Sequence, residues 1–132
     1  MSAPGSFAAL GGERFVSLTT FRRTGRPVAT AVWVAADGDD LVVLTPQDSG
    51  KVKRLRNSGQ VELRPCSRTG QVAAGAPTVA GHAEVLDDEA STLRVTDLVR
   101  RKYGAEYHVT MFVERVLARG QKPRVGLRIQ AS

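Results

Sequence analysis

The chain has 132 residues, a length that suits one domain, residues 1–132, with one hydrophobic core. Its net charge of +6 fits an anionic partner, but no basic stripe interleaved with aromatic residues supports nucleic-acid binding. A single cysteine excludes an internal disulfide, and one cysteine with two histidines argues against a zinc site of the usual ligands. No apolar run is long enough to span a membrane, so we expect a cytoplasmic protein without a metal site.

The N-terminal third alternates short apolar runs with turn signals. It predicts a short helix over residues 6–12 and strands over 15–21, 28–36 and 41–45. Gly25 supplies a positive φ for the turn between the first two strands, and Asp37-Gly38 is typical of a hairpin before the third. These three strands are therefore expected to form an antiparallel meander.

The next stretch predicts a helix with an unusually basic start. Asp48 or Ser49 is expected to cap the helix, which ends near Gly59. Cations in the first turn oppose the helix dipole, and a bound anion would remove that conflict. We therefore predict a phosphate or carboxylate site at Ser49, Gly50, Lys51, Lys53 and Arg54; the alternative is a solvated basic turn.

The remaining chain predicts three more strands and two helices. The strands cover residues 60–66, 78–86 and 124–129, with Val125, Leu127 and Ile129 facing inward. One helix begins after Asp87 or Asp88 and ends at Gly104. The second covers about 106–118 and ends before Gly120. Its apolar stripe is expected to face the core and consists of Val109, Phe112, Val113, Val116 and Leu117. Antiparallel hairpins dominate, so the class is α+β, mainly β.

Other polar and aromatic residues give no catalytic constellation, so no catalytic residue is predicted. Trp33 is interpreted as a core or interface residue, and His82 as structural. Cys66 lies between Arg64 and Arg68, which are expected to lower its pKa, and is kept as a pocket-wall residue. If the protein is an enzyme, a bound cofactor carries the chemistry.

The order of these segments resembles the flavin- and deazaflavin-binding split β-barrel group related to pyridoxamine 5′-phosphate oxidase. The segments that carry the resemblance are Phe15–Thr20, Thr24–Pro27, Val32–Val34, Asp37–Asp39, Leu41–Thr45, Ser49–Lys51, Leu55-Arg56, Val61–Leu63, Val79–Val85 and Lys102–Gly104. Within the group, the chain looks most like the branch that uses the deazaflavin coenzyme F420. The abundance of Ala, Arg, Val and Gly also suits an actinobacterium, where this coenzyme is made.

The resemblance implies a six-stranded antiparallel split β-barrel with peripheral helices. It implies that Lys51 and its neighbours hold the cofactor phosphate, while two strands lie along the ring system. The strand residues are Ala29, Thr30, Ala31, Val32, Val43, Leu44 and Thr45. It also implies a homodimer with the cofactor at the subunit interface, in agreement with a core poor in large side chains, since aromatic residues make up only 5% of the chain.

The implied reaction is hydride transfer between the deazaflavin and a small electron-poor molecule such as an enone, a quinone or a tetrapyrrole. The alternatives are an FMN-dependent oxidase or reductase of the same fold, a cofactor-binding protein without turnover, and a basic domain that binds nucleic acid. Flavin-using members often carry Ser-Arg-Lys where this chain has Ser49-Gly50-Lys51. The missing Arg favours F420 over FMN, although Arg54 is a possible substitute.

Overall fold

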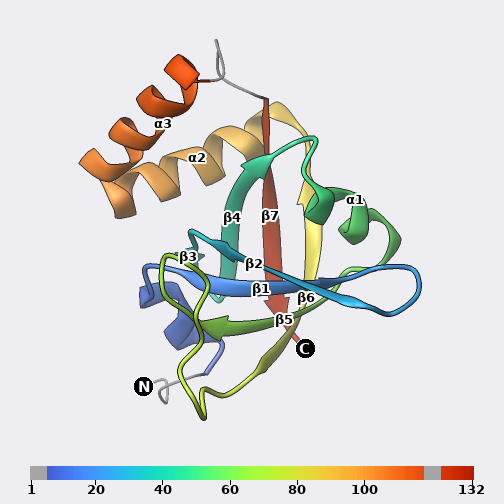
Figure 1. Cartoon of the computed structure of the whole chain (residues 1–132). Coiled ribbons are helices and arrows are strands. Elements are labelled where there is room, and N and C mark those ends of the chain that lie inside the picture. The colour runs from blue at the N-terminus through green and yellow to red at the C-terminus, as the bar shows by residue number, and fades with distance from the viewer. Residues whose placement is uncertain (1–5, 118–122) are drawn as a thin grey trace.

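One antiparallel sheet forms the body of the protein in the computed structural model, which describes residues 6–117 and 123–132. Its strands are β1 (Val16–Phe21), β2 (Pro27–Val32), β3 (Ala35–Asp37), β4 (Asp40–Pro46), β5 (Gln60–Pro65), β6 (Val79–Leu86) and β7 (Arg124–Ala131). The helices are the 3-10 helix η1 (Ala8–Gly12), α1 (Gly50–Asn57), α2 (Glu89–Tyr103) and α3 (Ala105–Leu117). The described strands lie in the order β2-β1-β5-β6-β7-β4-β3. Figure 1 shows α2 and α3 together on one side of the sheet and α1 on the other.

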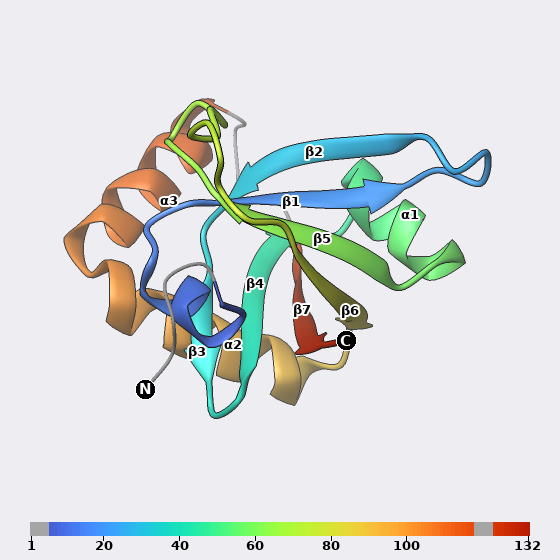
Figure 2. The same cartoon turned by 90° about the horizontal axis from the view of Figure 1, so that it is seen from below.

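The sheet is strongly curled, because β1, β2 and β5 run across the direction of β4 and β7 (Figure 2). Its inner face encloses the main core, which is built from aliphatic side chains of six strands, η1 and α1, together with Val34 between β2 and β3. Val125, Leu127 and Ile129 on β7 are at most 2% exposed, so the predicted inward face of the last strand is confirmed. The predicted α+β barrel-like architecture is confirmed, with seven strands among the described residues in place of six.

The predicted strand over 28–36 forms as two strands, β2 and β3, because it is interrupted at Trp33 and Val34. The backbone N–H of Val34 donates to the hydroxyl of Tyr103 at 3.0 Å, and its carbonyl accepts from Lys102 at 2.5 Å. Both polar groups of Val34 thus bond to side chains of α2 and not to a neighbouring strand. The break separates β2 from β3 and explains the additional strand.

The two antiparallel hairpins of the predicted meander form, but they do not make one continuous meander, since β2 and β4 are not neighbours. β2 pairs with β1 at one edge of the sheet, whereas β4 pairs with β7 and β3 at the other. The turn signals themselves are confirmed, because Gly25 has φ +88° and Gly38 has φ +62°. These local turns were predictable, but the break before β3 carries the chain into the other half of the sheet.

The turn between β3 and β4 is fixed by charged side chains from distant elements. Asp37 accepts from Arg94 of α2 at 2.7 Å and from Arg128 of β7 at 2.8 Å. These two guanidinium groups lower the pKa of the Asp37 carboxyl to about 2. Ionised Asp37 therefore ties the turn to both the sheet and the helix that covers it.

α2 begins and ends as predicted and covers the outer face of the sheet. The Asp88 side chain accepts from the backbone N–H of Ser91 at 2.9 Å, and Gly104 ends the helix with φ +56°. α2 lies close to β7 at Gly126, where an added Cβ would come within 2.8 Å of Val95 Cγ2. The absence of a side chain at Gly126 is what permits this approach.

α3 forms over the predicted residues, but its apolar stripe does not face the core. The five stripe residues, Val109, Phe112, Val113, Val116 and Leu117, are 46–79% exposed. α3 instead packs on α2 through Tyr107 and Met111, because α2 already occupies the outer face of the sheet. Gly120, the predicted end of this segment, lies outside the described residues. No helix in the described part of the chain is long and apolar enough to cross a bilayer.

Candidate functional site

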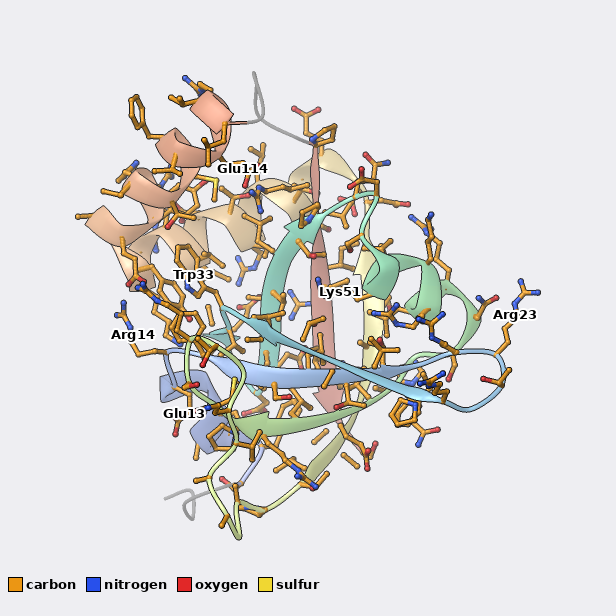
Figure 3. The ribbon with its side chains drawn as sticks, viewed as in Figure 1. Glu13, Arg14, Arg23, Trp33, Lys51 and Glu114 are labelled. Carbon is orange, nitrogen blue, oxygen red and sulfur yellow. The ribbon has the colours of Figure 1, made fainter. Side chains whose placement is uncertain are left out.

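A pocket of about 300 Å³ lies where the ends of β2 and β4 meet the first turn of α1 and one side of α3. Five predicted cofactor residues line it: Ala31, Val32, Leu44, Thr45 and Lys51. Figure 3 shows Trp33, Lys51 and Glu114 around this region, whereas Arg23 lies at the far end of the β1–β2 hairpin. The structure therefore brings parts of the predicted ring site and of the predicted anion site into one cavity.

The first turn of α1 is a helix start whose N–H groups are not capped by a side chain. Ser49 occupies the predicted N-cap position with an extended backbone, but it makes no capping hydrogen bond. Its hydroxyl lies 3.4 Å from the hydroxyl of Thr45, and Lys51 Nζ donates to the same Thr45 oxygen at 3.2 Å. Thr45 is almost fully buried, so it fixes the Lys51 ammonium at the pocket wall.

Arg54 folds back over the start of its own helix. Its Nε donates to the Thr20 hydroxyl at 2.6 Å, which anchors the side chain to the end of β1. A Cβ added to Gly50 would lie 2.8 Å from Arg54 Nη1, so the guanidinium occupies the space that a side chain at residue 50 would enter. Lys53, in contrast, points to solvent.

The cations at this helix start have no acidic partner. Within residues 6–117 and 123–132, no carboxylate pairs with Lys51, Lys53 or Arg54. Burial, followed by repulsion from Arg54, lowers the pKa of the Lys51 ammonium. An anion placed here would relieve this repulsion and pair with the free helix N–H groups.

The sequence reasoning missed the aromatic and charged walls of the pocket. Phe15 and Trp33 flank the ends of β1 and β2 and supply apolar surface. Glu114 of α3 forms an ion pair with Arg124 of β7, and both side chains line the pocket and are mostly buried. The two residues lie on consecutive elements, but their pairing depends on how α3 packs beside the start of β7, and no local sequence pattern predicts it.

The other predicted ring-site residues lie outside the pocket. Val43 is fully buried in the main core, and Ala29 lines a separate depression on the outer face of β1 and β2. The Thr30 hydroxyl is buried with no hydrogen-bond partner among the described residues. Binding roles for these residues therefore remain predictions, and the pocket favours Ala31 and Val32 on β2.

Two further residues can now be placed. Burial raises the pKa of the Cys66 thiol, and the Glu13 carboxylate raises it further, so the predicted lowering by Arg64 and Arg68 is wrong. Cys66 directly follows β5 and does not line the 300 Å³ pocket. The His82 imidazole packs against Gly59, where an added Cβ would lie 2.4 Å from its Cε1. This contact agrees with the structural interpretation of His82.

A larger depression of about 560 Å³ lies between the β1–β2 turn and the end of α1. It is lined by Arg22, Arg23 and Asn57 among others, and Arg23 donates to Asn57 at 3.2 Å. The smaller pocket is the better site for a planar ligand, because it combines aromatic walls with the half-buried Lys51 ammonium.

Comparison with known proteins gives a family match and several structural neighbours. The family described as pyridoxamine 5′-phosphate oxidase matches residues 6–132. No curated protein matches the chain. The conserved hypothetical protein Rv2991 of Mycobacterium tuberculosis is 25% identical, with a TM-score of 0.66 over 92% of this chain and 75% of its own.

Two other structural neighbours are proteins described as having different functions. The heme storage protein HutZ of Vibrio cholerae is 16% identical, with a TM-score of 0.64 over 91% of this chain and 82% of its own. An F420 reductase is 17% identical, with a TM-score of 0.62 over 96% of this chain and 93% of its own. At these identities, the two likenesses establish the fold.

Proposed function

The chain belongs to the pyridoxamine 5′-phosphate oxidase family, and on this basis we propose that it is an oxidoreductase dependent on coenzyme F420. In this proposal it transfers a hydride between the deazaflavin and a small electron-poor acceptor. The observation that carries the proposal is the cationic, uncapped start of α1 at the edge of an apolar and aromatic pocket. A planar cofactor that bears a phosphate has the matching chemistry.

The residues present fit the phosphate of such a cofactor. Lys51 would donate its ammonium protons, and the first N–H groups of α1 would donate beside it, because no side chain caps them. Arg54 is held in place by Thr20, so its free Nη groups would meet the anion without further ordering. Binding of the phosphate at this point would fix the position of the whole ligand along the pocket.

The pocket walls fit the ring system. Trp33 and Phe15 offer apolar surface, and the ends of β2 and β4 offer small side chains and backbone groups. The bound deazaflavin supplies the hydride chemistry, and the protein orients the ring and keeps water away from it. In this proposal the acceptor would bind on the side of α3, where Thr110 lines the pocket.

FMN is the second candidate, and Arg54 supports it. The Arg that flavin-using members often carry at the position of Gly50 is absent, but the Arg54 guanidinium occupies the adjoining space. The phosphate site therefore has a guanidinium close to Lys51, although it comes from residue 54 and not from residue 50. The heme storage neighbour also makes non-catalytic binding a third outcome to test.

We further propose a homodimer with the cofactor at the subunit interface. The exposed apolar side chains of α3 support this, because a contiguous apolar face of this kind is uncommon on a monomer. α3 also borders the pocket, so a partner at this face would close the site.

The test is a side-by-side titration of the purified protein with F420, FMN and heme. Micromolar or tighter binding of F420 alone, about −8 kcal/mol or better, supports the proposal. Oxidation of the reduced coenzyme by an enone or quinone would then show turnover. Preference for FMN moves the assignment to flavin chemistry, and binding of heme alone overturns both.

A further inference from the structure

Trp33, the single tryptophan of the chain, stands at the break between β2 and β3. It lines the 300 Å³ pocket and also a neighbouring apolar depression of about 490 Å³ on the side of Val109. The indole therefore forms a wall shared by both spaces. No strand pairing holds this residue, so its position must be set by other contacts.

The first of these contacts is an aromatic stack from α2. The rings of Trp33 and Tyr103 lie with centroids 4.3 Å apart and planes 11° from parallel. The Tyr103 hydroxyl accepts from the backbone N–H of Val34 at 3.0 Å and donates to the carbonyl of Arg14 at 2.8 Å. Val34 directly follows Trp33 and Arg14 directly precedes Phe15, so one hydroxyl anchors the backbone beside both aromatic walls.

The second contact is the ammonium group of the preceding residue. Lys102 Nζ donates to the carbonyls of Gly11 at 2.9 Å, Glu13 at 2.5 Å and Val34 at 2.5 Å. An ammonium has three protons, so each of these carbonyls can receive one. Lys102 and Tyr103, the last two residues of α2, thus bond both to the segment before β1 and to Val34, which follows β2.

We propose that Tyr103 and Lys102 are positioning residues that hold Trp33 and Phe15 in place as the aromatic walls of the cofactor pocket. This inference rests on the proposed function for its consequence in binding. Its structural content, that the end of α2 and not the sheet immobilises Trp33, stands without a cofactor. Variants of either residue should therefore loosen Trp33 even in the free protein.

The protonation of Lys102 provides an independent readout. Burial, with a further contribution from Arg14, lowers the pKa of Lys102 to about 8, against the opposing effect of Glu13. Burial raises the pKa of Tyr103, the other titratable group that meets the ammonium. Above pH 8 the neutral amine has only two N–H groups for three carbonyls, so Trp33 should become more mobile as the pH rises through this value.

The experiment measures acrylamide quenching and anisotropy of Trp33 fluorescence in the free protein. Tyr103→Phe keeps the ring stack and removes the hydroxyl bonds to Val34 and Arg14, while Lys102→Met keeps the side-chain stem and removes the ammonium. The matched controls are Tyr107→Phe, a buried tyrosine with no hydroxyl bond in the described structure, and Arg101→Met, an exposed cation on the same helix turn. Both test variants should increase quenching, and the controls should match the wild type.

Cofactor affinity is measured in the same variants. Tyr103→Phe should raise the Kd about 2- to 10-fold, the change expected for one net hydrogen bond. Folded test variants with unchanged quenching and unchanged Kd would overturn the proposal. If the variants fail to fold, the wild type decides it: anisotropy that is constant between pH 7 and 9 overturns it as well. If no cofactor binds the wild type, the proposed function fails, but the fluorescence data still test whether Tyr103 and Lys102 position Trp33.

Discussion

Replacing Lys51 by methionine tests the proposed phosphate site most directly. The change removes the ammonium but keeps a stem of similar length against the pocket wall. A charge-assisted hydrogen bond to a phosphate contributes about 1.5–3 kcal/mol, so the Kd for the cofactor should rise about 10- to 150-fold. The loss should be smaller at high salt, because the part that depends on charge is screened.

The same substitution should not destabilise the free protein. Lys51 is half-buried beside Arg54, and both conditions lower the pKa of its ammonium. The positive charge of Lys51 therefore destabilises the folded state. Removing the charge relieves this destabilisation, while Thr45 keeps a hydroxyl neighbour in Ser49 at 3.4 Å. The melting temperature without ligand should therefore stay the same or rise. A functional residue that opposes stability in this way is typical of binding sites.

The assay is a calorimetric titration paired with thermal unfolding. The matched control is Arg56→Met, which removes one positive charge from the same helix at an exposed ion pair with Asp87. The control should bind the cofactor nearly as well as the wild type. An unchanged Kd for F420 and FMN in Lys51→Met would refute the helix-start reasoning, and so would an affinity loss matched by an equal loss of stability.

Three other predictions concern stability and assembly. Gly126→Ala should lower the free energy of unfolding by about 1–3 kcal/mol, because the new methyl group meets Val95 at 2.8 Å; Gly12→Ala, which meets nothing within 4 Å, is the control in denaturant unfolding. The pKa of Asp37 is about 2 in the folded protein, below its ordinary value of 3.8, so the stabilisation by ionised Asp37 is present above pH 4 and is lost as the pH falls toward 2. Acid unfolding should therefore show less pH dependence in this range for Asp37→Asn than for the wild type. Phe112→Ser should shift a dimer toward monomer in light scattering, and an unchanged mass would contradict a contact through α3.

Local signals in the sequence were sufficient for most elements and for part of the pocket lining. The basic start of α1 was predictable because turn residues and the helix dipole act within one turn, although the expected side-chain cap does not form. The contact of the Lys51 ammonium with the Thr45 hydroxyl at 3.2 Å, which joins the two predicted sites, is a finding of the structure. The partners Glu114 and Arg124 were not predictable, since their contact depends on where α3 crosses the end of β7.

By itself, the sequence determined the turns, the two ends of α2 and the inward face of the last strand. Gly25, Asp37-Gly38, Asp88 and Gly104 act on the backbone within a few residues, so their effect is independent of the rest of the chain. Only the tertiary structure decided the break at Val34, the separation of β2 from β4 and the exposure of the α3 stripe. Each of these depends on α2, which supplies the partners of Val34 and covers the sheet before α3 can reach it. Competition between distant segments for one surface cannot be read from local periodicity, because periodicity records which face is apolar but not what covers it.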